Sequence, residues 1–150
     1  MTEFAVALSR TIPGPRHEVY RAFLEPDLLQ RWMCPGEFAV VTASVDEHVG
    51  GRHVVEMLAP NGERLAFESV IRDLVMDERI VLDFAFVGPE PGTREETLLT
   101  VTFADAGEGA TEVRFEHERI TLAPPHFDRP GVNAGWTSVL EKLEAHFERS

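Results

Sequence analysis

Two histidines are the side chains that could most readily do chemistry, because each lies in an otherwise apolar alternating stretch. His53 alternates with Val55, and His117 follows Phe115 at the same two-residue spacing. An imidazole in such a place could hydrogen-bond a ligand carbonyl or hydroxyl, or act as an acid or base near neutral pH. The same pattern is typical of a half-buried histidine satisfied by backbone groups. Both interpretations stay open here, and Ser69 is a third inward polar residue.

Other kinds of chemistry find little support in the sequence. The six histidines show no HxH, HxxH or HExxH spacing, so we expect no metal site. No serine lies in the G-x-S-x-G context of a strained nucleophile turn. Cys34 is the single cysteine, which excludes an internal disulfide and a cysteine-rich zinc site. We therefore assign no catalytic residue and expect no cofactor.

The elements that must position these residues follow from hydrophobic periodicity. Alternation with a period of two predicts strands over 3–11, 38–46, 51–59, 63–75, 79–87, 95–104 and 111–121. Two short helices, 15–25 and 26–32, are expected after the first strand, the second beginning on Pro26. Apolar residues at helical spacing from Trp136 to Phe147 predict a long amphipathic helix over 130–148. The proline-rich segment 123–131 is either a rigid connector or a gate with Phe127 as a plug.

Composition limits the class of protein. The 150 residues include 26 Asp and Glu against 14 Lys and Arg, a net charge of −12, which disfavours nucleic acids and anionic membranes as partners. No apolar run approaches the ~20 residues that a membrane helix needs. The N-terminus does not resemble a secretory signal. We expect one domain over residues 1–150 in the cytoplasm, and the sequence leaves open a homodimer formed through an edge strand or the N-terminal strand.

Several short motifs in a fixed order resemble a known family. They are a proline-started helix ending in Trp-x-x-Pro, a glycine pair before a strand, a hairpin Asn-Gly, a His-Glu pair and a helical Gly-Trp-x-x-x-Leu-x-x-Leu: Pro26 to Pro35, Gly50-Gly51-Arg52, Asn61-Gly62, His117-Glu118 and Gly135 to Leu143. Together they resemble the SRPBCC (START/Bet v 1-like) superfamily, and within it the activator of Hsp90 ATPase homologue-like group.

The resemblance implies an α+β helix-grip fold, in which a seven-stranded antiparallel sheet wraps around the long C-terminal helix. It also implies a deep hydrophobic pocket between sheet and helix. It does not imply one activity, because function depends on the site and not on the fold.

The predicted ligand site combines inward-facing strand residues with apolar residues of the helices. Its members are Trp32, His53, Val55, Phe67, Ser69, Leu82, Phe84, Phe103, Phe115, His117, Trp136 and Leu140. Aromatic side chains dominate this set, and they would either line a pocket for a flat or lipid-like molecule or fill an ordinary core.

Three functions are consistent with the sequence. The first is a binding protein for a hydrophobic, lipid-like or aromatic small molecule, with His53, Ser69 and His117 orienting a polar end. The second is a cyclase- or dehydratase-type enzyme that uses His53 or His117 as its acid–base group. The third is a co-chaperone-like protein-interaction module. We favour binding without catalysis.

Overall fold

The structure is a computed structural model that describes residues 3–90, 92–121 and 128–149. Segment 122–127, with the predicted plug Phe127, lies outside the described residues. The elements are β1 (Glu3–Ile12), α1 (Arg16–Ala22), α2 (Pro26–Trp32), β2 (Ala39–Val45), β3 (Arg52–Leu58), β4 (Arg64–Val75), β5 (Arg79–Val87), β6 (Arg94–Asp105), β7 (Thr111–Thr121) and α3 (Arg129–Glu148).

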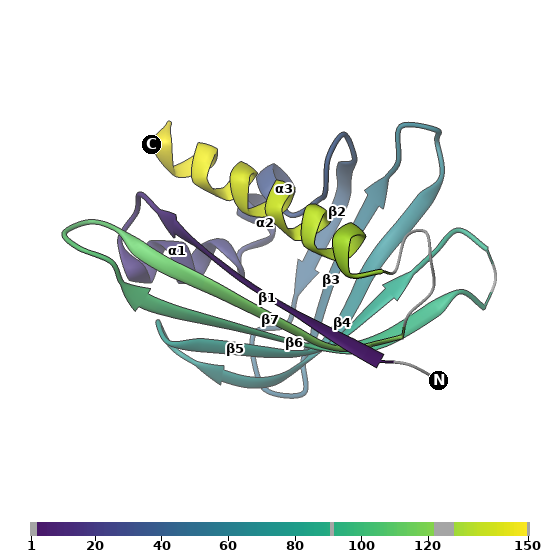
Figure 1. The fold of residues 1–150 in the computed structure, drawn as a ribbon, viewed down its shortest axis with the longest axis horizontal. Coiled ribbons are helices and arrows are strands. Elements are labelled where there is room, and N and C mark those ends of the chain that lie inside the picture. Colours follow the sequence, from purple (N-terminus) through teal and green to yellow (C-terminus); the bar gives the residue numbers. More distant parts are fainter. Residues whose placement is uncertain (1–2, 91, 122–127, 150) are drawn as a thin grey trace.

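The seven strands form one antiparallel sheet in the order β1-β7-β6-β5-β4-β3-β2. The sheet curves, and α3 lies across its inner face (Figure 1). The predicted α+β helix-grip architecture is therefore confirmed. β2 to β7 form a meander, in which each strand pairs with the next one in sequence. β1 instead pairs with β7, so the first and last strands of the chain are neighbours.

Local chemistry explains where the elements end. α1 stops at Ala22, earlier than predicted, because Glu25 precedes Pro26 and takes an extended conformation with φ −93° and ψ 120°. The same proline occupies the first turn of α2, where its missing N–H costs nothing. α3 begins one residue earlier than predicted, at Arg129, because the Asp128 side chain caps the helix by accepting from the Gly131 N–H at 2.8 Å.

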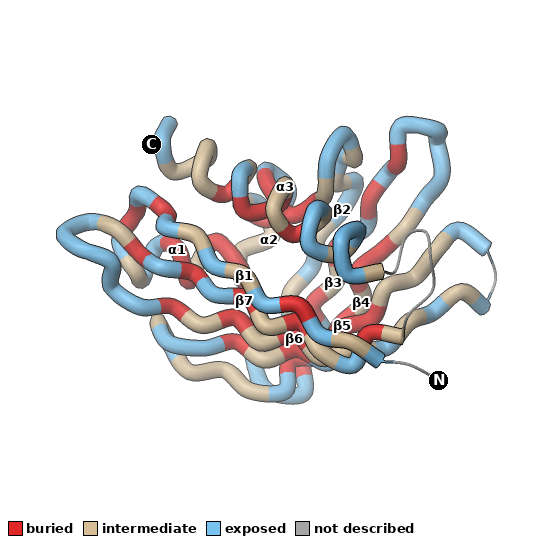
Figure 2. Tube along the Cα trace, in the orientation of Figure 1, coloured by how far each residue is buried: buried red, intermediate tan, exposed pale blue. Residues whose placement is uncertain are grey.

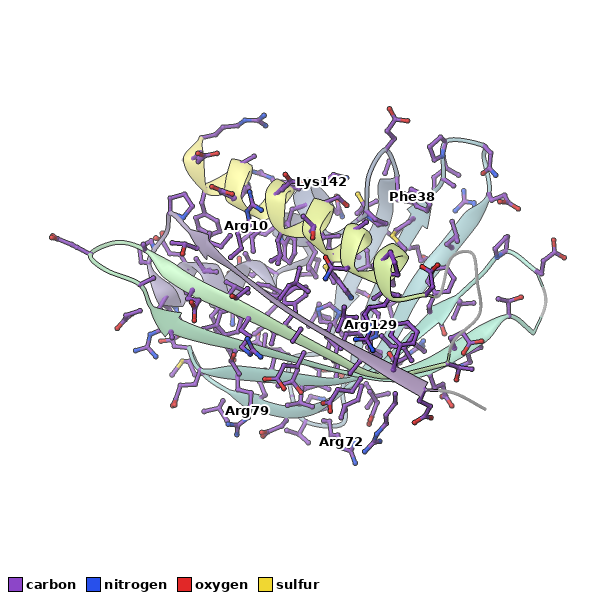
Figure 3. All side chains as sticks on the ribbon, viewed as in Figure 1. Arg10, Phe38, Arg72, Arg79, Arg129 and Lys142 are labelled. Atoms are coloured by element: carbon purple, nitrogen blue, oxygen red, sulfur yellow. The ribbon has the colours of Figure 1, made fainter. Side chains whose placement is uncertain are left out.

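Burial follows the predicted alternation along the strands. Inward residues of β3 and β7 are buried while their neighbours are half-buried or exposed, and buried segments line the space between sheet and α3 (Figure 2). β5 follows the same pattern as far as Phe84, after which Ala85 is buried and Phe86 half-buried. On the outer face, ion pairs such as Arg72–Asp83 at 3.3 Å and Arg79–Asp73 at 2.8 Å cover the sheet. Arg72 and Arg79 point away from α3 (Figure 3). One face of the sheet is thus solvated, and the other must be covered by α3.

Candidate functional site

The space between the sheet and α3 is filled at one end by an aromatic cluster, called here the packed end. Phe23 makes edge-on contacts with Trp32 and Phe103, with ring centroids 4.6 and 5.2 Å apart. Trp32 is fully buried, and its indole N–H donates to the Ala22 carbonyl at 3.1 Å. Phe115 is also fully buried and lies 6.0 Å from Phe23. Rings at these distances leave no room for a ligand.

His53 belongs to this packed end. Its Nε2 lies 2.7 Å from the Phe23 carbonyl oxygen, so Nε2 carries the proton and donates it. Burial lowers the pKa of His53, and the side chain is 4% exposed. His53 therefore ties β3 to the end of α1 as a neutral donor.

At the other end of α3 the interior opens into a pocket of about 740 Å³. Its lining residues place it beneath the first half of α3, between the β3–β4 hairpin and the β5–β6 hairpin. These two hairpins spread apart beside the start of the helix (Figure 1). Its volume falls within the roughly 300–1,000 Å³ of small-molecule sites.

Apolar and aromatic side chains form most of the pocket wall. One face of α3 supplies Gly131, Val132, Gly135, Trp136 and Val139. The segment after α2 supplies Pro35 and Phe38. The sheet and its hairpins supply the rest: Met57, Ala59, Pro60, Asn61, Glu63, Leu65, Phe67, Phe84, Phe86, Gly88, Pro89, Glu90, Thr93 and His117. The rings of Phe67 and Trp136 stack at 6.0 Å, and Phe84 lies 4.9 Å from Phe67 and 5.5 Å from Trp136. The aromatic face of the pocket is therefore continuous.

Gly135 is a point of α3 with free space beside it. Apart from its two chain neighbours and the nearby backbone of the helix itself, no heavy atom would lie within 4 Å of a Cβ added there. The neighbouring lining residues, Val132, Trp136 and Val139, show that this face of the helix is turned to the pocket. A glycine in mid-helix costs roughly 0.5–1 kcal/mol relative to alanine, and here it leaves the pocket open.

A relay of hydrogen bonds fixes the inner wall. The Trp136 indole N–H donates to Nδ1 of His117 at 2.9 Å. An indole nitrogen can only donate, so Nδ1 is unprotonated and the proton of the neutral ring is on Nε2. Nε2 lies 2.7 Å from the Thr97 hydroxyl oxygen, which therefore accepts from it and donates in turn to the Phe84 carbonyl at 2.8 Å.

This relay determines the charge state of His117. Burial lowers the pKa of His117 to about 4, so the ring is neutral near pH 7. Protonation at Nδ1 would break the bond from Trp136 and leave a charge among aromatic rings. The arrangement makes His117 a positioning residue that holds the Trp136 ring against the pocket.

The structure separates the twelve predicted site residues into two groups. Phe67, Phe84, His117 and Trp136 line the pocket together. Seven others are buried elsewhere, in the core: Trp32, His53, Val55, Leu82, Phe103, Phe115 and Leu140. Ser69 is also buried, and its hydroxyl has no hydrogen-bond partner within the part of the chain that the structure describes.

Sequence reasoning missed the pocket mouth. Phe38 and Leu65 form part of its apolar wall, and the two hairpin tips contribute Glu63 and Glu90. The signal that could have found the α3 contribution is the spacing of Val132, Gly135, Trp136 and Val139, which places them on one face of a helix.

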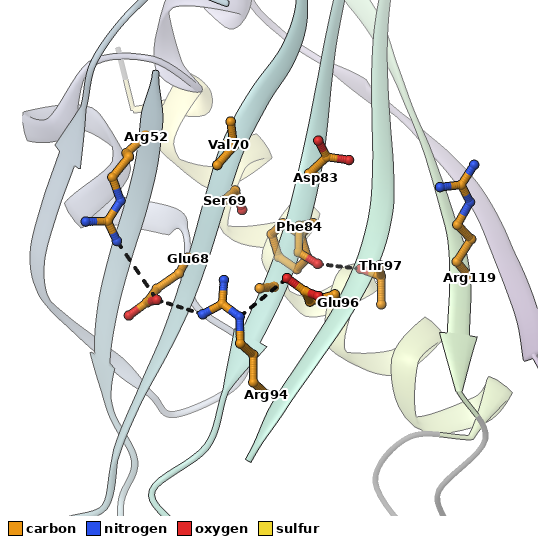
Figure 4. A pocket seen from close by; sticks show the side chains of 11 residues that line it. Arg52, Glu68, Ser69, Val70, Asp83, Phe84, Arg94, Glu96, Thr97 and Arg119 are labelled. Carbon is orange, nitrogen blue, oxygen red and sulfur yellow. Dashed lines mark hydrogen bonds and ion pairs between the residues drawn. The ribbon is translucent and has the colours of Figure 1, made fainter. Parts of the chain in front are cut away.

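A second hollow, of about 470 Å³, lies on the outer face of the sheet (Figure 4). Its charged residues compensate one another: Glu68 lies 2.9 Å from Arg94 and 3.9 Å from Arg52, and Arg94 is 3.5 Å from Glu96. Such exposed pairs contribute little energy, typically about 0–1 kcal/mol each. We regard this hollow as a solvated, charge-paired surface.

Neither metal ligands nor a membrane helix occur among the described residues. No group of three or more His, Cys, Asp or Glu side chains in ranges 3–90, 92–121 and 128–149 could hold a metal ion. Within the same ranges, no helix is long and apolar enough to cross a membrane.

A curved antiparallel sheet that grips one long helix and leaves an apolar pocket beside it defines the helix-grip class of α+β proteins, a fold of the ligand-binding type. The chain belongs to the family described as activator of Hsp90 ATPase homolog 1-like protein, whose model matches residues 13–148. The resemblance inferred from the sequence motifs is therefore confirmed.

Solved structures of bacterial relatives share the fold. A protein from Chromobacterium violaceum is 30% identical, with a TM-score of 0.76, 97% of this chain covered and 98% of that one. An uncharacterised protein from Rhizobium leguminosarum is 25% identical, with a TM-score of 0.82 and coverage of 99% and 97%. The AHSA1 protein from Silicibacter pomeroyi, at 14% identity, a TM-score of 0.74 and coverage of 97% and 98%, is similar in fold alone. No curated protein matches the chain.

Proposed function

We propose that this protein binds a hydrophobic small molecule, aromatic or lipid-like, in the pocket beneath the first half of α3. The observation that carries the proposal is the pocket itself: about 740 Å³, walled by Phe67, Phe84, Phe86 and Trp136. Burial of apolar ligand surface there would contribute roughly 25 cal/mol per Å² before the cost of association. The hydrogen bonds of His117 support binding without catalysis, because they hold the Trp136 ring against the pocket and occupy both imidazole nitrogens.

The other two predicted functions have no geometric support of this kind. Acid–base chemistry needs an imidazole nitrogen that can reach a substrate, whereas the known bonds of His53 and His117 lead to Phe23, Thr97 and Trp136. A co-chaperone role rests only on the family name. A cytoplasmic location and a homodimer stay predictions.

Two substitutions of Gly135 test the proposal with N-phenyl-1-naphthylamine, an uncharged aromatic probe that fluoresces in apolar surroundings. Gly135→Phe should place a ring in the open space and reduce probe affinity at least tenfold. Gly135→Ala is the matched control, since it makes the same change to the helix backbone but adds one methyl group. It should bind the probe like the wild type.

The proposal fails if the wild-type protein does not bind the probe, or if both Gly135 variants bind it equally well. If the probe binds as expected, native mass spectrometry of gently purified protein would identify the class of the natural ligand, as a mass above the 16.8 kDa chain that disappears on denaturation.

A further inference from the structure

The charged side chains that line the pocket, within the part of the chain that the structure describes, are all acidic. Among the described lining residues, the only charged side chains are Glu63, on the β3–β4 hairpin, and Glu90, on the β5–β6 hairpin. Glu95 adds a third carboxylate nearby, because it shares the inward face of β6 with Thr97 and pairs with Phe86 in the sheet register. The rim of the pocket is therefore acidic on two sides.

The basic residues next to the pocket lining in sequence are directed elsewhere. Arg64 is exposed and alternates with the inward Leu65, so it lies on the outer face of β4. Arg94, next to Thr93, pairs with Glu68 and Glu96 on the outer face of the sheet (Figure 4). Arg129, near the start of α3, donates to the Ala5 carbonyl and lies over the Phe4 ring at 5.6 Å. None of these guanidinium groups is placed to receive an anionic ligand.

Three hydrogen-bond donors of the described wall are also committed. The Trp136 N–H and the His117 Nε2–H serve the relay, and the Asn61 amide donates to Glu63 at 2.8 Å. An anion taken into an apolar pocket needs donors or a positive charge to replace its water, otherwise it is strongly disfavoured.

A cationic ligand, unlike an anionic one, would be attracted by the groups that line the pocket. The faces of Phe67, Phe84, Phe86 and Trp136 carry negative potential that attracts an ammonium group, and the rim carboxylates add to it. The chain's net charge of −12 acts in the same direction at longer range.

We propose that this pocket selects apolar ligands whose polar end is a protonated amine, and discriminates against carboxylates of the same shape. This inference rests on the proposed function, because it concerns which ligands the same pocket accepts. The discrimination arises from Glu63 and Glu90 at the rim and from the aromatic wall behind them.

The test is displacement of N-phenyl-1-naphthylamine by two competitors with the same apolar body, 4-phenylbutylamine and 4-phenylbutyrate, at pH 7. At low salt the amine should displace the probe at a concentration about tenfold lower than the acid, and the ratio should shrink as salt screens the rim charges. The double variant Glu63→Gln with Glu90→Gln should lower the ratio clearly toward one, leaving the smaller preference that the aromatic wall provides.

A matched control separates the rim from the overall charge of the protein. Glu108→Gln with Glu112→Gln changes the net charge equally, but at the β6–β7 turn and the start of β7. It should keep the wild-type ratio. Equal displacement by both competitors, or tighter binding of the acid, overturns this inference while leaving the proposed function standing. Absence of probe binding overturns both.

Discussion

Aromatic residues line both ends of the space between the sheet and α3, but side chains fill one end and the other end holds a pocket. Trp32, Phe23 and Phe103 close the packed end with rings 4.6 to 5.2 Å apart. Trp136, Phe67 and Phe86 face a pocket of about 740 Å³ at the other end. The difference comes from what covers the sheet. α1 and α2 add buried side chains at the packed end, whereas Gly131 and Gly135 on α3 add none above the pocket.

The largest expected effect is the loss of unfolding free energy when a phenylalanine is replaced by alanine, compared between the two ends. Phe115→Ala should lower the free energy of unfolding by about 3–5 kcal/mol, because it leaves a cavity in closely packed surroundings. Phe86→Ala should cost only about 1 kcal/mol, because Phe86 is half-buried and already borders open space. Urea denaturation of both variants measures the contrast, and equal losses would show that the pocket is as tightly packed as the core.

The relay behind the pocket should give stability a pH dependence. His117 titrates near pH 4 in the folded protein and near 6.5 when unfolded, so the unfolded chain takes up a proton first as the pH falls. This contribution is complete above pH 6.5 and is lost as the pH falls toward 4, by about 3 kcal/mol at most. His117→Gln removes the titrating group and should flatten the profile of unfolding free energy measured by urea denaturation from pH 7.5 to 4.

His48→Gln is the control for that profile. His48 is exposed, and hydrogen bonding to the Val49 carbonyl raises its pKa, which is the opposite direction to His117. Protonated His48 therefore adds to the free energy of unfolding at low pH, and this contribution is lost as the pH rises. Removing it should leave the pH profile of the unfolding free energy as steep as in the wild type, or steeper. A His117→Gln profile as steep as the wild type would contradict the buried relay.

The smallest expected effect compares two glycines. Gly135→Ala should raise the free energy of unfolding by roughly 0.5–1 kcal/mol through helix propensity, since nothing beyond its two chain neighbours and the nearby helix backbone lies within 4 Å of the added methyl. Gly14→Ala should destabilise, because its Cβ would lie within 3 Å of two ring atoms of Phe147. Thermal unfolding of both variants resolves the sign, and stabilisation by Gly14→Ala would show that Phe147 moves aside freely.

Alternation predicted the seven strands and their inward faces because side-chain direction along a strand depends only on local geometry. His53, Ser69 and His117 were correctly placed on buried faces for that reason. Alternation does not say how far along a strand the covering helix lies. Hence Phe103 and Phe115 were grouped with Phe67 and Phe84, although the structure puts the first two in the core and the second two at the pocket.

The hydrogen-bond partners of His117 could not be predicted from the sequence pattern either. Nothing in the spacing of His117 indicates that it accepts from Trp136 and donates to Thr97, because those contacts join α3, β6 and β7 only once the sheet has curved. The rim glutamates are also invisible in sequence, because Glu63 and Glu90 lie 27 positions apart (90 − 63) in two turns that only the fold brings to one pocket.

The two tryptophans allow the central claim to be tested in a single spectrum. Trp32 lies in the packed end and Trp136 at the pocket, so each indole N–H resonance reports on one region. In a two-dimensional ¹H–¹⁵N spectrum, assigned with Trp32→Phe, addition of N-phenyl-1-naphthylamine should shift the Trp136 indole signal and leave that of Trp32 in place. A shift of Trp32 alone, or no shift of either signal at saturating probe, would contradict a binding site beneath the first half of α3.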